Sequence, residues 1–234
     1  MSNNPLVTIQ HLSKNYGAYP VLQDINLSLE AGSIVGLLGP NGCGKTTLMK
    51  IMTGLISDYS GGVLIDGHKP DVYTKSIVSY LPEKTYLRDS MRPIDAVDLF
   101  HDFYSDFDRQ KALEMLNRFQ LDPRQRIKSM SKGMQEKVQL ILVMSRAARL
   151  YLLDEPMAGV DPAARSVILD TILTNYSENS TVMLSTHLIY DVERVFDHIV
   201  MLGYGKMVMN DTVDNIRNQT GKSLDEVFRE VFRC

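Results

Sequence analysis

The sequence is poor in cysteine and lacks any long apolar run, and both shortages limit what the protein can be. Its two cysteines, Cys43 and Cys234, supply neither a disulfide framework nor the spacing of a metal site, and they suit a reducing cytoplasm. No apolar stretch approaches the roughly 20 residues that a membrane span requires. Residues 1–5 have no signal-sequence pattern. We therefore expect a soluble, cytoplasmic chain.

An excess of positive charge is also missing. The 25 lysines and arginines are outnumbered by 28 aspartates and glutamates, which gives a net charge of -3 and a pI near 6.0. Because no basic field attracts polyanions, we expect no nucleic-acid partner. The chain does have 234 residues with 44% hydrophobic content, enough for one sizeable core, and it shows no repeat or low-complexity tract.

A glycine-rich octet at residues 39–46, with the sequence GPNGCGKT, fits the pattern G-x-x-x-x-G-K-[ST] of a phosphate-binding loop. Glycines let the backbone approach the phosphates, and the helix that follows adds the positive end of its dipole. Lys45 is expected to reach the β- and γ-phosphates, and Thr46 to bind Mg²⁺ through its hydroxyl. The predicted ATP-binding residues of this loop are Gly39, Asn41, Gly42, Cys43, Gly44, Lys45, Thr46 and Thr47.

Strand and helix patterns alternate along most of the chain. The strands are expected at residues 6–12, 21–29, 33–38, 61–67, 77–81, 150–153, 181–185, 199–202 and 206–209. Residues 94–119 have helical periodicity, with caps expected near Asp106 and Asp108. Strands that alternate with helices imply a largely parallel core sheet.

The strand at 150–153 ends in two adjacent carboxylates, Asp154 and Glu155. Ligands of open parallel sheets bind at such strand ends. Behind a phosphate loop, Asp154 is expected on the Mg²⁺ side, and Glu155 is placed to polarise the water that attacks the γ-phosphate. The alternative is an acidic pair that merely ends a strand.

The run MSKGMQ at residues 130–135 precedes an apolar-sided helix and stands shortly before the acidic pair. Ser131 is a good helix N-cap, so a simple helix start is the alternative interpretation. Together with the phosphate loop, this run resembles the signature motif of ABC-type ATPases. The resemblance covers nearly the whole chain and implies one α/β ABC ATPase domain. Residues 1–88 and 148–234 would form a P-loop NTPase (RecA-like) core with an antiparallel β-subdomain, and residues 89–147 an α-helical subdomain.

In that family, ATP lies between the phosphate loop of one subunit and the signature helix of another. The resemblance therefore implies a dimer with a second ATPase subunit, either identical or different. Ser131, Gly133 and Asp161 match the residues that contact ATP across the interface. For Asp161, a helix cap is the simpler alternative.

Two further residues match family positions at the nucleotide. Tyr16 matches the aromatic residue that stacks on adenine, although Tyr19 lies nearby and a surface tyrosine is the alternative. His187, at the end of the strand at 181–185, matches the switch histidine that contacts the γ-phosphate. The other histidines are expected to be structural.

The sequence departs from the family pattern at Glu83, where glutamine is usual, and at Lys132, where the signature has its first glycine. A carboxylate still binds Mg²⁺, so the expected metal set is Thr46, Glu83 and Asp154. The alternative for Glu83 is a surface acid.

Glu83 and the C-terminal segment 223–228 are similar to ATPases of ABC-2 exporters of drugs, antibiotics or peptides. This resemblance implies separate transmembrane permease subunits, a peripheral location on the cytoplasmic face of the membrane, and dimer closure driven by ATP. A groove near Glu83 and residues 84–91 is expected to receive a coupling helix of the permease. A soluble or regulatory ABC ATPase without a membrane partner is the alternative.

Overall fold

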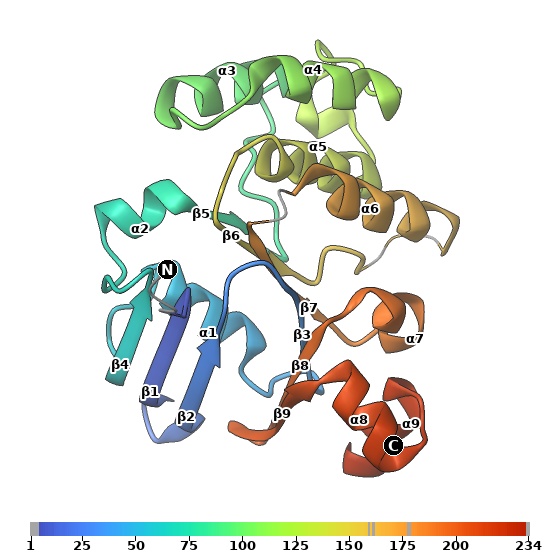
Figure 1. Ribbon diagram of the computed structural model, residues 1–234. Helices are drawn as coiled ribbons and strands as arrows, with labels where there is room; N and C mark the ends of the chain where they lie inside the picture. Colours follow the sequence, from blue (N-terminus) through green and yellow to red (C-terminus); the bar gives the residue numbers. More distant parts are fainter. Residues whose placement is uncertain (1–4, 159, 161, 177–178, 233–234) are drawn as a thin grey trace.

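The computed structural model describes residues 5–158, 160, 162–176 and 179–232. Two sheets form its frame (Figure 1): an antiparallel one of order β2-β1-β4 and a larger one of order β5-β6-β7-β3-β8-β9. Neighbouring strands of the larger sheet are parallel, except β8 and β9. The strands are β1 (Val7–Tyr16), β2 (Tyr19–Leu29), β3 (Ile34–Leu38), β4 (Ser60–Ile65), β5 (Val78–Leu81), β6 (Leu150–Asp154), β7 (Thr181–Thr186), β8 (His198–Gly203) and β9 (Lys206–Thr212). This arrangement confirms the predicted α/β fold.

The larger sheet is covered on both faces, which explains why its central strands are apolar at nearly every position. Side chains of β3 alternate between two clusters. Val35 and Leu37 pack with helix α1 (Lys45–Met52) and the antiparallel sheet, whereas Ile34 and Leu38 pack in the cluster that contains most of the other helices. Since β3 is an interior strand, the loop from β3 to α1 lies at the middle of the sheet's carboxyl edge.

Strand β1 continues to Tyr16, beyond the end predicted from its alternation at residue 12. The pairing with β2 shifts register between Ile9 and Leu12, and His11 between them has a φ of 49°. Gly61 of β4 approaches this bulge so closely that a Cβ atom on it would lie 2.3 Å from the carbonyl oxygen of His11. A bulge interrupts the alternation without ending the strand, so the sequence pattern stops too early.

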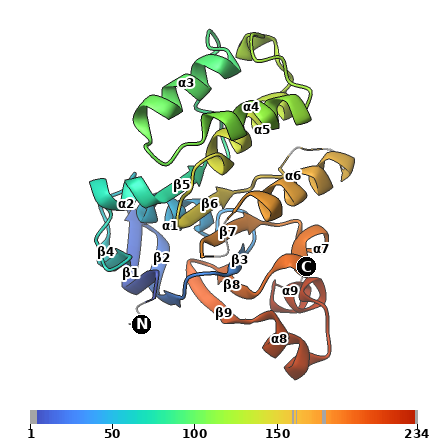
Figure 2. The same cartoon turned by 45° about the horizontal axis from the view of Figure 1, so that its top comes forward.

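A helical layer lies between β5 and β6 in the chain. It comprises α3 (Pro93–Phe103), α4 (Arg109–Arg118), the 3-10 turn η1 (Ile127–Ser129) and α5 (Lys132–Met144). Figures 1 and 2 show α3 and α4 on the outside and α5 between them and the sheet. The helical stretch predicted at 94–119 is two helices, and Asp108 caps the second by accepting from the Lys111 amide at 2.9 Å. Asp106 is not a cap, because its carboxylate pairs with Arg146.

Arg146 joins this helical layer to the larger sheet. Its Nε donates to Asp106 Oδ1 at 3.0 Å, while Nη1 and Nη2 donate to the carbonyl oxygens of Val78 (2.6 Å) and Ser76 (2.5 Å). The guanidinium also lies 3.9 Å from the centre of the Tyr104 ring. All three nitrogens of the planar guanidinium thus donate hydrogen bonds. A lysine, with one ammonium group, could not reproduce this arrangement.

The remaining helices cover the sheet edges and faces. They are α2 (Val72–Ile77), α6 (Pro162–Asn175), α7 (Ile189–Val192), the 3-10 turn η2 (Glu193–Val195), α8 (Val213–Thr220) and α9 (Leu224–Phe232). Helices α8 and α9 lie together at the C-terminal end of the chain (Figure 1). Glu193 holds the start of α9 by accepting from the Leu224 amide at 3.0 Å. Among the described residues, no helix combines the length and apolarity needed to cross a membrane.

Candidate functional site

The loop between β3 and α1 has the backbone that a phosphate cradle requires. Gly39, Gly42 and Gly44 have φ values of 154°, 80° and 109°, a region that residues with a Cβ atom rarely adopt. A Cβ on Gly39 would lie 2.3 Å from the carbonyl oxygen of Leu202 in β8, so the loop is pressed against the sheet there. Around Gly42, by contrast, no atom of the described residues comes within 4 Å of such a Cβ. One side of the loop is therefore packed and the other is open.

Lys45 begins α1 and folds back over this loop. Its Nζ donates to the carbonyl oxygen of Gly39 at 2.7 Å, and the side chain is buried. Thr46 and Thr47 follow in the first helical turn and are half-buried, while Asn41 is exposed on the loop. Lys45 and the positive end of the α1 dipole thus lie at this loop, as expected for a site that binds phosphate oxygens.

Cys43, in the same loop, is buried. Burial raises the pKa of its thiol, and the positive charge of Lys45 opposes that rise. The thiol is therefore kept in its protonated form, so Cys43 packs in the loop as a small apolar side chain.

Asp154 and Glu155 are held by Ser185, a residue to which the sequence analysis gave no role. Asp154 ends β6 directly opposite Ser185 of β7. The Ser185 hydroxyl donates to Asp154 Oδ1 at 2.7 Å and accepts from the Glu155 amide at 2.9 Å. Glu155 has a φ of 50°, a strained value for a residue with a side chain. Ser185 can be identified only when β6 and β7 are known to be parallel neighbours, because their carboxyl ends then lie side by side.

Glu155 lies between two groups that the sequence analysis assigned to the nucleotide. Its Oε1 is 3.6 Å from Lys45 Nζ, and its Oε2 is 2.9 Å from His187 Nδ1. The Glu155 side chain is only 10% exposed, whereas that of His187 is 46% exposed. The structure thus brings Lys45, Glu155 and His187 together from α1, the end of β6 and the end of β7.

The residues expected to hold Mg²⁺ fit a hard cation. Asp154 is 1% exposed, and within the described part of the chain its Oδ2 has no hydrogen-bond partner. A buried, unmatched carboxylate oxygen is the type of ligand that Mg²⁺ prefers. Glu83 is itself exposed, but it lines one small hollow together with Asp154 and Glu155. Thr46, the third residue expected to bind the cation, lies in the first turn of α1.

Three other predicted residues lie at the periphery. Tyr16 ends β1 with its ring 49% exposed, and Lys14 Nζ lies 4.9 Å from the ring centre. Ser131 is the N-cap of α5 and accepts from the Met134 amide at 3.3 Å. Gly133 follows in the first turn, where no atom of the described residues comes within 4 Å of a Cβ placed on it. Asp161 lies outside the described residues.

The sequence model of the family described as ABC transporter matches residues 22–158, which is more than half of the chain and includes the loop, the run at 130–135 and the acidic pair. The chain belongs to the ABC transporter family. It is the ATP-binding subunit type of that family, which hydrolyses ATP. The loop at 39–46 is accordingly the Walker A motif of an ABC ATPase.

Relatives of this ABC ATPase match over nearly its full length. An uncharacterized ABC transporter ATP-binding protein of Methanocaldococcus jannaschii is 31% identical over 217 residues, 91% of this chain and 79% of the relative. A lantibiotic transport ATP-binding protein of Streptococcus pyogenes is 28% identical over 225 residues, 95% of this chain and 96% of the relative. The solved structure of an ATP-binding subunit of an ABC transporter superposes with a TM-score of 0.87 at 29% identity and covers 97% of this chain and 99% of that one.

Proposed function

We propose that this ATPase powers an exporter whose membrane-spanning subunits are separate chains, and that ATP closes a dimer of ATPase subunits. Relatives support the exporter assignment: one is the lantibiotic transport protein. Another is a daunorubicin resistance ATP-binding protein of Streptomyces coeruleorubidus, 28% identical over 96% of this chain and 74% of the relative. A drug, antibiotic or amphipathic peptide is therefore the proposed class of cargo. The chain would work at the cytoplasmic face of the membrane.

The residues gathered at the Walker A loop suggest which of them would bind ATP and which would hydrolyse it. ATP would stack its adenine on Tyr16 and place its phosphates on the loop, with Lys45 at the β- and γ-phosphates. Glu155 would take a proton from the attacking water, and His187 would contact the γ-phosphate. Thr46, Asp154 and Glu83 would hold Mg²⁺, which supplies charge neutralisation for the phosphates.

A second subunit would complete the site. Ser131 at the start of α5 is exposed, and so is the adjacent Lys132. An exposed helix start with a free glycine turn is suited to an anion brought by another molecule. In the closed dimer, Ser131, Gly133 and Asp161 of one subunit would contact the ATP bound by its partner. Hydrolysis then removes the charge that holds the two subunits together, and the dimer opens.

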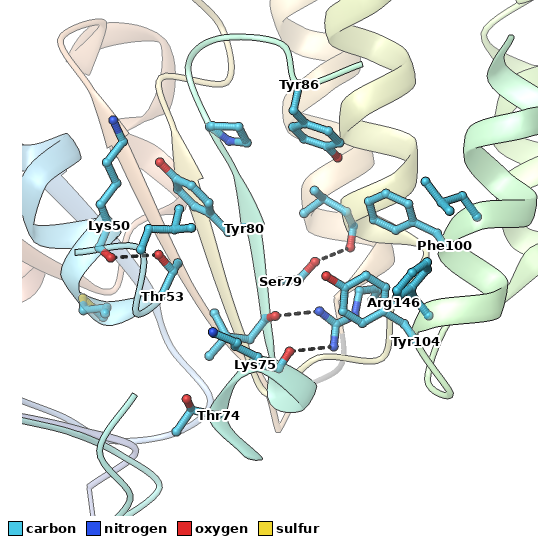
Figure 3. A pocket seen from close by; sticks show the side chains of 17 residues that line it. Lys50, Thr53, Thr74, Lys75, Ser79, Tyr80, Tyr86, Phe100, Tyr104 and Arg146 are labelled. Carbon is cyan, nitrogen blue, oxygen red and sulfur yellow. Dashed lines mark hydrogen bonds between the residues drawn. The ribbon is translucent and has the colours of Figure 1, made fainter. Parts of the chain in front are cut away.

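The observation that carries the exporter proposal is an apolar groove between the larger sheet and the helical layer (Figure 3). It has a volume of about 580 Å³. Tyr86 and Leu99 on its rim are 43% and 44% exposed, and Phe103 is exposed further. The rings of Tyr86 and Phe100 stack with centres 6.3 Å apart. Exposed aromatic side chains that line one groove are typical of a protein interface.

We assign this groove to a short helix of the permease. It opens beside Pro82, directly before Glu83, and Tyr86 follows three residues later. A helix that binds there and moves would displace Tyr86. Because only three positions separate Tyr86 from Glu83, the proposed Mg²⁺ ligand, the movement would be transmitted to Glu83. This position links a membrane partner to the hydrolysis site without any contact between the partner and ATP.

The test is gentle detergent extraction of the tagged chain from its native membranes, followed by identification of copurifying proteins and an ATPase assay of the same sample. A stoichiometric partner with several membrane spans, together with ATP turnover, is expected. A soluble partner, or recovery of the chain only from the cytosol, would contradict the exporter proposal.

Groove variants refine the same test. Tyr86→Ala and Leu99→Ser should reduce recovery of the permease and leave the basal ATPase rate of the isolated chain unchanged. Tyr204→Ala is the matched control, because Tyr204 is 89% exposed and lies in the turn between β8 and β9. Unchanged recovery with both groove variants would show that the permease docks elsewhere.

A further inference from the structure

The groove between the larger sheet and the helical layer has two walls that differ in chemistry. One wall is aromatic, and Phe100 and Phe103 of α3 line it together with Tyr86. The other wall carries Lys50, in the last turn of α1, and Lys75, in the last turn of α2. Figure 3 shows Lys50 and Phe100 on opposite sides of the groove. A molecule bound in the groove would therefore contact positive charge on one side and aromatic rings on the other.

The charged side chains that line this groove are all cations. No aspartate or glutamate is found among the described residues that line it, although the chain as a whole has a net charge of -3. Arg146 is buried and already pairs with Asp106. In the part of the chain that the structure describes, the ammonium groups of Lys50 and Lys75 form neither an ion pair nor a hydrogen bond. The groove thus has two positive charges that nothing in the chain neutralises.

The two lysines lie near the same end of α1. The Cε atom of Lys75 would lie 3.7 Å from a Cβ placed on Gly54, which directly follows the C-cap of α1, Thr53. Lys50 is half-buried and Lys75 is exposed. Like charges placed close together repel each other, and a carboxylate bound at this wall would remove that repulsion. The wall is therefore suited to an acidic group of another molecule.

A second hollow continues the groove. It has a volume of about 520 Å³ and shares Tyr86 and Phe100 with the groove, so these two rings lie between the two hollows. Arg88 lines the second hollow, as does Asp95, whose carboxylate accepts from the Arg92 amide at the start of α3. Each hollow alone has the size of a small-molecule site. An occupant that fills both is therefore an elongated segment of a macromolecule.

We propose that the permease segment in this groove is an amphipathic helix with an acidic edge. Its carboxylates pair with Lys50 and Lys75, and its apolar face contacts Tyr86 and the rings of α3. Two walls of unlike chemistry accept such a helix in one rotational orientation, because a half turn would place its carboxylates against the rings. The proposal rests on the proposed function, which assigns the groove to the permease, and it adds the charge pattern of the permease helix.

The two lysines have a simpler alternative role. A lysine in the last turn of a helix stabilises the helix dipole, and both Lys50 and Lys75 occupy such positions. If this were their only role, removal of the ammonium groups would lower the denaturant concentration at which the chain unfolds. Binding of the permease would not change. The experiment therefore measures unfolding and binding separately.

The first measurement is recovery of the permease in the detergent-extracted complex. Lys50→Glu combined with Lys75→Glu should lower recovery about tenfold or more, because it opposes like charges at the interface. Lys50→Met combined with Lys75→Met removes the charge and keeps the chain length, so recovery should fall less and should no longer depend on salt. Lys206→Glu, at an exposed position of β9, is the matched control and should leave recovery unchanged. Denaturant unfolding shows whether each variant is folded.

The second measurement needs no variant. A carbodiimide activates a carboxylate, which then forms an amide bond with an amine in contact with it. Treatment of the unaltered complex, followed by mass spectrometry, should show Lys50 or Lys75 joined to an aspartate or glutamate of the permease. A phospholipid phosphodiester has no carboxylate and forms no such amide bond.

The outcomes distinguish this inference from the exporter proposal. Equal recovery of the permease by the unaltered chain and the charge-reversal variant would overturn the acidic helix and leave the exporter proposal standing. Absence of a cross-link from either lysine to the permease would do the same. If no permease copurifies with the unaltered chain, both proposals fail. If the charge-reversal variant keeps the permease but no longer binds vesicles of anionic phospholipid, the lysines contact lipid headgroups and the acidic helix is wrong.

Discussion

The ammonium group of Lys45 lies 3.6 Å from Oε1 of Glu155, so the lysine of the Walker A loop is paired with the carboxylate at the end of β6. Both side chains are largely buried. Phosphate oxygens of ATP would compete with Glu155 for this lysine, because both are anions that bind the same ammonium. Binding of ATP would then free the Glu155 carboxylate from Lys45, so that it can act on water. Glu155 would therefore become active only when ATP is bound to the loop.

Replacing Glu155 by glutamine should keep ATP binding and stop its hydrolysis. The amide retains the shape but cannot take a proton, so turnover should fall by about 10²-fold or more. ATP should accumulate in a stable dimer. Phosphate release and size-exclusion chromatography with ATP measure both effects, and Glu30→Gln, at an exposed position, is the control. Retained steady hydrolysis in the Glu155→Gln protein would refute the role of Glu155.

Loss of the Ser185 hydroxyl should lower both stability and turnover. Ser185→Ala leaves the Asp154 carboxylate and the Glu155 amide with one partner fewer, at a cost of about 1–3 kcal/mol in the free energy of unfolding. Ser180 offers a matched control, since its buried hydroxyl donates to the Ala148 carbonyl oxygen at 2.7 Å, just before β7 begins. Ser180→Ala should cost similar stability in urea titrations and leave kcat unchanged. Equal loss of kcat in both variants would contradict a role for Ser185 in the site.

Removal of the Arg146 side chain should strongly destabilise the protein. Arg146→Ala removes the donors to two carbonyl oxygens and to Asp106 where the helical layer meets the sheet. Because the arginine is buried, the expected loss is about 3 kcal/mol. The control is Arg109→Ala, whose ion pair with Asp98 is exposed and should contribute less than about 1 kcal/mol. Denaturant unfolding measures the free energy of unfolding of both variants. Similar losses would show that the hydrogen bonds of Arg146 stabilise the protein no more than a surface ion pair does.

Tyr16 and Tyr19 lie at the two ends of the same hairpin turn and pair in register, which permits a direct comparison. If Tyr16 stacks on adenine, Tyr16→Ala should raise KM for ATP about tenfold, and Tyr16→Phe should change it little. Tyr19→Ala should leave KM unchanged. The measurement is the ATPase rate as a function of ATP concentration. Equal effects of the substitutions at Tyr16 and Tyr19 would show that adenine binds to another surface.

The sequence predicted those parts of the site that are continuous in the chain. The Walker A loop was recognisable because its glycines, Lys45 and Thr46 are fixed by local backbone geometry. Ser185 was missed, because its role depends on the register of β6 against β7, which no local pattern encodes.

Element boundaries failed where tertiary contacts override periodicity. Strand β1 passes through the bulge at His11, which Gly61 of β4 approaches closely and whose amide donates to Asn26 Oδ1. Asp106 looked like a helix cap, but it serves Arg146, forty residues later in the chain. Composition and periodicity cannot predict the role of a residue whose partner is distant in the sequence.

The place of β3 in the larger sheet sets an order of events during synthesis. Its partners are β7 and β8, which follow it by more than half the chain, and Gly39 rests against the Leu202 carbonyl group of β8. A nascent chain therefore carries the entire Walker A sequence long before the surface on which that loop folds has left the ribosome. Such distant pairings form late. Nucleotide binding is thus among the last properties that the growing polypeptide acquires, and the exposed edges of β3 are what a chaperone would have to cover until then.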